Sequence, residues 1–487
     1  MILRWLDDRL GAAGWARQGL RKVFPDHWSF LLGEVALFCF IVLVATGVFL
    51  TLFFRPDAAP VVYQGPYEPL QGREMSAAYQ SVLRLSFEVR AGLVMRQIHH
   101  WAALVFIAAI TMHLLRVFFT AAFRRPREFN WLVGIGLLIF SIGMGFTGYS
   151  LPDDLLSGTG LRIAYSVMIS IPFIGPYLGF LIFGGEFPTE GIISRLFVMH
   201  VMLLPALIIV LITIHLVVVV RQKHTQFKGI GRTESNVLGK PLWPSQAFRT
   251  TGLMLLTASL VSLLGGLVQI NPVWHYGPFQ ATTVSAPSQP DWYVGWLEGA
   301  LRLFPPVEFT ILGTTLPSPF IPGIVVPGVT FTAMALWPFI EKRITGDVAE
   351  HHLLDNPRDA PARTAVGVAG LLFFAVLTLA GGNDVLAITF QTSVEAITWV
   401  FRIAIILIPV VGGMMTRRIC VHLSASKLHP LARTAGVELR RNPQGGFDAI
   451  ARATPSAQLG RPTSHDGKGE RDSGEPEPPP ENQSYRY

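Results

Sequence analysis

The sequence predicts an all-α membrane protein with eight transmembrane helices. Of its 487 residues, 51% are hydrophobic and only 15% are charged, whereas soluble domains carry about 25% charged residues. Eight apolar stretches are each long enough to cross a hydrocarbon layer of about 30 Å as a helix. They lie near residues 29–54, 91–119, 131–151, 194–220, 251–271, 323–340, 364–381 and 394–416.

The segments outside these spans predict the topology. Residues 1–28 alternate charged and large apolar residues, a pattern typical of an amphipathic surface helix rather than of a signal peptide. Basic residues gather before the first span and after the second, fourth, sixth and eighth spans. Because basic loops stay on the cytoplasmic side, these loops and both termini are predicted to be cytoplasmic. The net charge of +7 is thereby explained without nucleic acid binding.

The C-terminal region and the cysteines add little chemistry. Residues 421–487 are predicted to form a cytoplasmic tail that is polar, rich in Pro and disordered after about residue 440. Cys39 and Cys420 are the two cysteines, and neither belongs to a CxxC or CxxCH motif. The sequence therefore encodes neither a disulfide framework nor a cysteine metal site.

The second span, "MRQIHHWAALVFIAAITMHLLR", carries ionisable groups that cost about 2–3 kcal/mol or more each at a bilayer centre. His99 and His113 are 14 residues apart, which on a helix is about 21 Å of rise and an angular offset of about 40°. They share one face, whereas His100 points elsewhere. In the fourth span His200 and His215 are 15 residues apart, and Pro205 between them is expected to bend the helix and alter the phase.

Spans two and four run in the same direction, so His99 is expected to face His200 near the outer side and His113 to face His215 near the inner side. A lone histidine in an apolar helix is more often a packing residue or part of a water-lined path. Two matched pairs favour another interpretation, in which each pair supplies both axial ligands of a haem iron. Residues 29–235 would then form a di-haem four-helix bundle, and residues 236–420 the other four spans.

Glycines and arginines repeat this pattern. Gly33 and Gly47 in the first span are 14 residues apart, and so are Gly134 and Gly148 in the third span. This is the spacing of His99 and His113. Glycine at these levels would let a porphyrin approach the backbone, although such glycines also serve ordinary helix packing. Arg96 lies three residues before His99 and Arg116 three residues after His113, so both lie on the ligand faces. They could pair with haem propionates or extend to lipid headgroups.

Several motifs together resemble the cytochrome b subunit of the quinol:cytochrome c oxidoreductases, the cytochrome bc1 complexes. They are "FCFIVLVATGVFLTLFFRP", "RQIHH" together with His113, "GFTGYSLP" and "PDWY", in that order. "GLVQINPVWHYGPF", "EGALRLFPP", "FIEKRITGD" and "HHLLDNPRDAPARTA" are similar to the actinobacterial branch in particular, which uses menaquinol.

The resemblance implies two non-covalent b-type haems. His99 and His200 would bind a low-potential haem, and His113 and His215 a high-potential haem. In mitochondrial relatives the two fourth-span histidines are 14 residues apart, like the second-span ligands. In this chain they are 15 residues apart, as in the cytochrome b6 branch. That branch holds an extra haem through a cysteine where this chain has Leu31, so we expect only two.

The resemblance also implies an activity and partners. Quinol would be oxidised at an outer site, with electron bifurcation to a Rieske iron-sulfur protein and to the low-potential haem. Quinone would be reduced at an inner site, which couples electron transfer to proton translocation. The expected partners are the Rieske protein, a c-type cytochrome subunit, a second copy of the complex and a terminal oxidase. The expected location is the bacterial cell membrane.

The outer quinol site is predicted where "PDWYVGWLEGALRLFPP" and "GYSLPDD" meet on the outer side. A carboxylate beside a low-dielectric cleft has the raised pKa that suits a proton acceptor, and Asp291 is the first candidate. Glu298, two helical turns on, is an alternative acceptor or carries the proton outward. The motifs add Tyr293 as a catalytic residue and Tyr149, Pro290 and Trp292 as quinone contacts, although PDWY alone could be an interfacial aromatic turn.

Two departures from the family bear on this site: Asp291 replaces the glutamate of "PEWY", and Asp153 replaces the tryptophan of "LPW". At the inner site, Arg21, Lys223 and His224 lie near the right depth, but surface basic residues are the simpler interpretation. Glu350–His352 is a weak metal signal for which we favour a non-metal role.

Two other functions remain open from sequence. A haem-bearing anchor of a quinone-linked dehydrogenase or hydrogenase also uses transmembrane histidines, but it would need neither PDWY nor the last four spans. A transporter could relay protons through intramembrane histidines, but it should show internal repeats and broken helices, and the sequence shows no repeat.

Overall fold

Long helices dominate the computed structural model, which describes residues 19–283, 289–311, 313–435, 437–441 and 447–451 and positions 5, 7–9, 11 and 14. Within these ranges, eight helical segments are long and apolar enough to cross a membrane, which confirms the predicted fold class. The spanning helices are α3 (Leu32–Thr51), α5 (Gly92–Phe119), α6 (Glu128–Tyr149), α9 and α10 (Ile192–Val198 and Leu204–Arg221), α11 (Ala247–Leu267), α14 (Val326–Thr345), α15 (Pro361–Gly381) and α17 (Val394–Ala435).

Shorter elements connect these helices. The short helices are α4 (Ala77–Phe87), α7 (Leu155–Ile169), α8 (Gly175–Phe183), α12 (Val273–Tyr276), α13 (Trp292–Leu303) and α16 (Asn383–Thr389). The described strands pair as β1 (Val23–Phe24) with β5 (Lys240–Pro241), β2 (Pro60–Val62) with β3 (Glu74–Ser76), β4 (Gln226–Phe227) with β8 (Leu353–Leu354), β6 (Phe309–Ile311) with β7 (Thr314–Leu316), and β9 (Val437–Arg441) with β10 (Phe447–Ala451). Only β4 and β8 are parallel among them.

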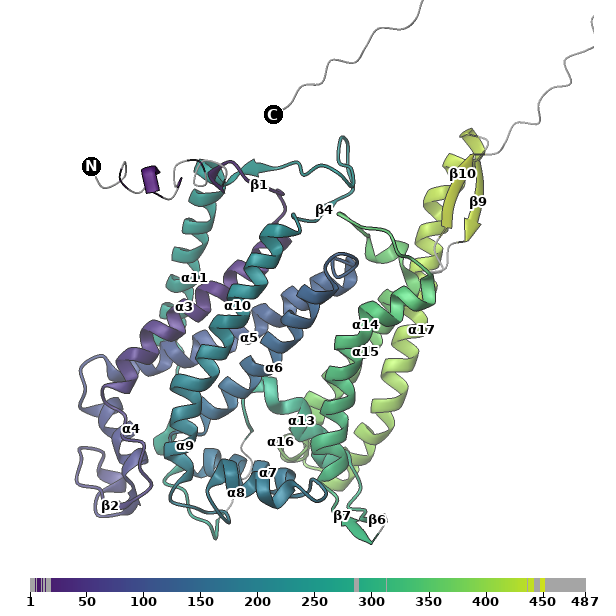
Figure 1. Cartoon of the computed structure of the whole chain (residues 1–487). Coiled ribbons are helices and arrows are strands. Elements are labelled where there is room, and N and C mark those ends of the chain that lie inside the picture. The colour runs from purple at the N-terminus through teal and green to yellow at the C-terminus, as the bar shows by residue number, and fades with distance from the viewer. Residues whose placement is uncertain are drawn as a thin grey trace, which may run out of the picture.

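The connections lie on two opposite sides of the helix layer (Figure 1). We call the side that carries β1 and β4 the N-terminal side, and the side that carries α4, α7, α8 and the β6–β7 hairpin the far side. The first corresponds to the predicted cytoplasmic side and the second to the predicted outer side.

The spanning helices form two groups (Figure 1). Helix α11 packs against α3 and α5, so it joins the N-terminal group, although the sequence division at residue 236 assigned it to the C-terminal part. The physical reason is a close contact: a Cβ on Gly265 would lie 2.7 Å from the backbone nitrogen of Ile98. Helices α13, α15 and α17 pack together in the second group, and α14 joins them through the Trp296–Phe331 ring contact and the Arg363–Glu341 ion pair.

Polar contacts join the two groups on the N-terminal side. Arg363 is buried and binds Glu341 at 2.5 Å and Asp355 at 2.8 Å. Arg124, in the loop after α5, binds the same Asp355 at 3.0 Å. Because buried charges are stable only when they are paired, these contacts fix the C-terminal group against α5. The indole of Trp131 on α6 donates a hydrogen bond to the carbonyl of Met334 on α14 at 2.7 Å, which is a second contact between the two groups.

The ends of the chain differ from the sequence prediction. In the surface helix predicted over residues 1–28, the described positions 5, 7–9, 14, 19 and 20 are helical, whereas the final part contains strand β1, which pairs with β5. The other positions before residue 19, except position 11, lie outside the described residues. Helix α17 continues to Ala435, and the β9–β10 hairpin extends beyond the predicted onset of disorder at about residue 440. Alternating apolar residues on either side of "NPQGG" favour a hairpin here. The remainder of the predicted disordered tail lies outside the described residues.

A π-helical turn, Met199–Leu203, separates α9 from α10 and contains His200. The amide of Leu204 bonds to the carbonyl of Met199, five residues back. A π-turn takes up one residue more than an α-turn, so it absorbs the extra residue between His200 and His215. The longer spacing in this span thus becomes helically equivalent to the spacing of the ligand pair on α5.

Candidate functional site

The four span histidines lie opposite one another in two pairs. The ring centroids of His99 and His200 are 6.2 Å apart, with their planes at 69°. Those of His113 and His215 are 6.3 Å apart, with their planes at 74°. The first pair lies toward the far side and the second toward the N-terminal side, as the order of residues along α5 requires.

These separations match the geometry of two imidazoles on one metal ion. Two metal–nitrogen bonds of about 2.0 Å, with each ring centre about 1.1 Å behind its nitrogen, would place the ring centres about 6.2 Å apart. Edge-to-face packing of two rings also gives centroid separations of about 4.5–7 Å, so the spacing accommodates a metal between the rings without requiring one.

Hydrogen bonds select the ring nitrogen that is free to bind metal in the far-side pair. The Thr46 hydroxyl donates to the carbonyl of Val42 at 2.7 Å, so it accepts from Nδ1 of His99 at 2.9 Å. Nδ1 of His200 donates to the carbonyl of Met144 at 3.0 Å. Since Nδ1 carries the hydrogen in both rings, both Nε2 atoms present lone pairs. This arrangement orients and activates metal ligands.

Three of the four predicted glycines lie directly against these rings. A Cβ on Gly33 would lie 3.2 Å from Cε1 of His113, one on Gly47 3.3 Å from Cε1 of His99, and one on Gly148 only 2.4 Å from Cε1 of His200. A Cβ on Gly134 would meet nothing within 4 Å, and Gly134 instead lines the cavity around His113 and His215. All four positions thus border the space between the histidines.

The two predicted arginines are in the bundle but lack ion-pair partners among the described residues. Arg96 is buried and donates to the carbonyl of Asn271 at 3.2 Å, while its Nε has no partner in the part of the chain described. The guanidinium of Arg116 lies 4.4 Å above the ring of Phe30. A guanidinium group that makes no ion pair with a described carboxylate suits an anionic group such as a propionate.

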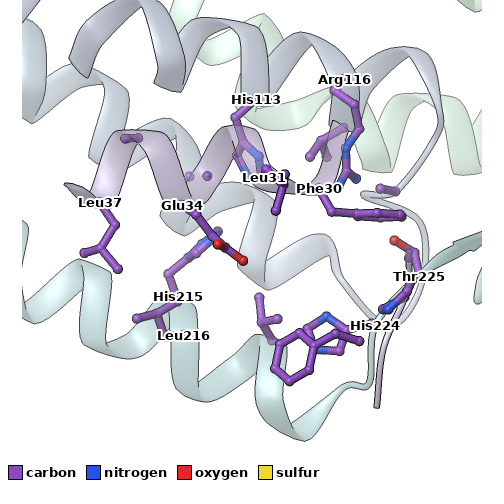
Figure 2. A pocket seen from close by; sticks show the side chains of 18 of the residues that line it. Phe30, Leu31, Glu34, Leu37, His113, Arg116, His215, Leu216, His224 and Thr225 are labelled. Carbon is purple, nitrogen blue, oxygen red and sulfur yellow. The ribbon is translucent and has the colours of Figure 1, made fainter. Parts of the chain in front are cut away.

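A cavity of about 880 Å³ surrounds the N-terminal-side pair. Figure 2 shows the rings of His113 and His215 entering it from opposite walls, with Arg116 and His224 further along. The volume lies within the range of cofactor and ligand pockets, about 300–1,000 Å³. The histidines, glycines and arginine present therefore fit haem, and the cavity continues beyond the histidines toward the surface.

His224 and Lys223, the sequence candidates for an inner quinone site, line this extension. His224 packs against Phe24 with ring centroids 4.5 Å apart and planes tilted by 43°, and its buried Nε2 has no partner among the described residues. Burial, reinforced by the charges of Lys22 and Arg127, lowers the pKa of His224 to about 4. The ring is therefore neutral at pH 7 and can donate from one nitrogen and accept at the other. Arg21 does not line the cavity.

On the far side, the structure brings "PDWY" and "GYSLP" together, as predicted. The hydroxyl of Tyr293 is so close to α6 that a Cβ on Gly145 would lie 2.6 Å from it. It donates to Oδ2 of Asp291 at 3.1 Å. Tyr149 donates to the carbonyl of Leu156 at 3.2 Å. Pro290 is partly buried and Trp292 is exposed beside this cluster.

His100 is the residue that the sequence argument missed at this site. It lies off the face of His99 and His113, as predicted, but its Nε2 is 3.0 Å from each carboxylate oxygen of Asp291. The two residues are 191 positions apart in sequence, so no local pattern could have joined them. The only available signal was an ionisable residue in an apolar helix with no assigned partner.

Glu298 is arranged differently from Asp291. Arg302 binds its Oε1 at 2.5 Å and also reaches Asp384 at 3.0 Å. The Oε2 of Glu298 is buried without a partner among the described residues. Burial raises the pKa of Glu298, against the lowering effect of Arg302. No described hydrogen bond joins Glu298 to Asp291, so the two predicted carboxylates belong to separate clusters.

The "LPDD" segment contributes two further carboxylates. Asp153 has a positive φ of 55°, and burial raises its pKa to about 6. Asp154 is buried and caps α7 by accepting from the amide of Ser157 at 2.7 Å. Burial raises its pKa to about 6, against the lowering effect of the Ser157 bonds and Arg96.

On the N-terminal side, the histidines of "EHH" contact protein groups: His351 bonds to Asp347 at 2.9 Å and His352 to Arg127 at 2.8 Å.

The fold and these sites define a helical membrane protein with two partly buried histidine pairs at different depths. Comparisons with known proteins agree. A family model described as "Cytochrome b(N-terminal)/b6/petB" matches residues 104–278. The cytochrome bc1 complex cytochrome b subunit of Streptomyces coelicolor is 48% identical over 96% of this chain and 86% of that protein. Those of Mycobacterium tuberculosis and Corynebacterium efficiens are 50% and 47% identical over 91% of this chain and 81% and 82% of their own.

A solved structure titled "Hyperthermophilic respiratory Complex III" matches with a TM-score of 0.64, covering 85% of this chain and 98% of that chain at 19% identity, and supports the fold. The chain belongs to the family of cytochrome b subunits of the cytochrome bc1 complex, a quinol:cytochrome c oxidoreductase, in its actinobacterial branch. It is thus a multi-pass membrane component of an electron-transport enzyme. This membership decides against the dehydrogenase anchor and the transporter.

Proposed function

We propose that this chain binds two b-type haems, oxidises menaquinol on the far side and reduces quinone on the N-terminal side. The observation that carries the proposal is the separation of both ring pairs, 6.2 and 6.3 Å, which leaves room for one metal in each. When bound, the haems would supply one-electron transfer between the two sides, with two histidines holding each iron.

The residues that would hold the haems follow from their positions. His99 and His200 would bind the low-potential haem, with Gly47 and Gly148 against its ligands. His113 and His215 would bind the high-potential haem, with Gly33 and Gly134 beside it. Arg96 and Arg116 would each face a propionate. The Nδ1 bonds of His99 and His200 hold both rings with Nε2 available.

On the far side, Asp291 would accept a proton from the quinol hydroxyl. Its carboxylate lies at a partly buried site between α5 and α13, where water competes weakly for the proton. Tyr293 fixes one carboxylate oxygen, and Tyr149, Pro290 and Trp292 would border the quinone ring. Glu298, paired with Arg302, would lie beyond this first acceptor. Bifurcation requires a second electron acceptor, for which we propose a Rieske iron-sulfur partner.

On the N-terminal side, quinone would occupy the outer part of the cavity. The unpartnered Nε2 of His224 supports this assignment, because a buried ring nitrogen needs a polar partner and a quinone carbonyl supplies one. Proton uptake here and release on the far side would translocate protons across a bacterial cell membrane. Both termini would be cytoplasmic, and the complex would include a c-type cytochrome subunit, a second copy and a terminal oxidase.

The proposal is tested by counting haems in the purified protein with a pyridine haemochrome assay. We expect two protohaems per chain, and a count of zero would overturn the proposal. In the assembled complex, Asp291→Asn should lower quinol oxidation by about 10²-fold or more, the usual contribution of general base catalysis, while both haems remain. Glu88→Gln, at an exposed far-side carboxylate, is the control. Unchanged turnover in Asp291→Asn would remove Asp291 from the mechanism.

A further inference from the structure

The carboxylate of Asp291 is held from outside its own helix. Asp291 is the residue before α13, yet its side chain makes no capping bond to that helix. Its described partners are the hydroxyl of Tyr293 at 3.1 Å and Nε2 of His100 at 3.0 Å from both oxygens. Only the His100 contact comes from α5.

The His100 contact has a defined direction. An ionised carboxylate can only accept hydrogen bonds, so Nε2 of His100 carries the hydrogen and donates it. Because this nitrogen is 3.0 Å from both oxygens, the donated bond is shared between them and the nitrogen faces the middle of the carboxylate. The side chains of His100 and Asp291 are 14% and 17% exposed, so little water competes for the bond.

We infer that His100 is a positioning residue for quinol oxidation: the hydrogen bond from its Nε2 holds the Asp291 carboxylate ready to receive the quinol proton. This inference rests on the proposed function. In the step concerned, a quinol O–H bond breaks, an O–H bond forms on Asp291, and the electron leaves to the proposed acceptors. His100 remains a donor throughout and neither gains nor loses a proton.

The inference explains how aspartate can stand where the family has glutamate. Aspartate is one methylene shorter, so its carboxylate stays close to the start of α13 and reaches less far. A donor fixed on α5 defines where that carboxylate lies relative to the bundle. Without His100, Asp291 retains the Tyr293 bond on one oxygen, but the second oxygen has no described donor.

The test compares His100→Leu, which removes the donor, with His100→Gln, which keeps an N–H on a side chain of similar reach. Each variant is purified in the complex and assayed for haem content, kcat and KM for menaquinol. We expect His100→Leu to lower kcat at least tenfold, with two haems per chain and KM changed less than threefold. His100→Gln should recover most of kcat. His422→Leu, at an exposed position on α17, is the matched control.

The decisive comparison repeats His100→Leu in an Asp291→Asn background. If His100 acts through the Asp291 carboxylate, the second substitution changes kcat less than twofold there. A full tenfold effect in that background, or wild-type kcat in His100→Leu alone, would overturn the inference. Failure of the proposed function is distinguishable, because it would appear as missing haems or absent quinol oxidation in the unsubstituted complex.

Discussion

Substituting Gly148 by alanine should remove the far-side haem selectively. A Cβ at this position would lie 2.4 Å from Cε1 and 3.0 Å from both ring nitrogens of His200, whereas non-bonded carbons meet at about 3.5–4.0 Å. The ring would have to retreat by about 1 Å. It cannot do so freely, because its Nδ1 is bound to the carbonyl of Met144 at 3.0 Å.

The magnitude follows from the cost of overpacking, about 1–3 kcal/mol. A cost of that size lowers haem affinity at the His99/His200 pair by about 5- to 150-fold. Gly47→Ala, whose Cβ would lie 3.3 Å from His99, requires a shift of only a few tenths of an ångström and should retain more haem.

The assay is the haem count of each purified variant, with a reduced-minus-oxidised difference spectrum to identify the remaining haem. We expect Gly148→Ala to approach one haem per chain and Gly47→Ala to stay nearer two. Gly328→Ala, at an exposed α14 position where a Cβ meets nothing within 4 Å, controls for glycine replacement in a spanning helix. Two haems with an unchanged spectrum in Gly148→Ala, or equal losses in both bundle variants, would refute the reasoning.

Two further predictions concern buried groups outside the spanning helices. His224→Phe should weaken binding of a menaquinone analogue by about fivefold, since one hydrogen bond contributes about 1 kcal/mol; equilibrium dialysis measures this, and unchanged affinity would remove His224 from the inner site. Burial raises the pKa of Asp154 to about 6, so the folded state binds the proton more tightly than the unfolded state, and stability is lost as the pH rises from about 4 to about 6. Asp154→Asn keeps a good N-cap residue and removes this loss. Its thermal stability advantage over the unsubstituted protein should therefore be larger at pH 7.5 than at pH 5, by about 1 kcal/mol. An advantage that is equal at both pH values would contradict this account.

Sequence reasoning predicted the features that depend on local periodicity. Hydrophobicity located all eight spans, because length and composition determine membrane crossing. Helical arithmetic predicted which histidines would face each other, since direction and depth follow from span order. The glycine positions followed from the same spacing.

The features that sequence reasoning missed depend on contacts between distant segments. The position of α11 depends on Gly265 meeting Ile98, and the partner of Asp291 is 191 residues away at His100. Glu298 was grouped with Asp291 because they lie two turns apart, but Arg302, one turn further along the same helix, binds it instead. Local spacing gives no information on such competition between partners.

The π-turn Met199–Leu203 changes how histidine spacing should be counted. A search that fixed the interval at the one between His99 and His113 would reject His200 and His215, although the ring centroids of the two facing pairs have nearly equal separations of 6.2 and 6.3 Å. The two histidines of each helix are separated by the same number of helical turns, because the wide π-turn takes up the one inserted residue. Alignments of such helices should therefore allow a single-residue gap beside the first histidine.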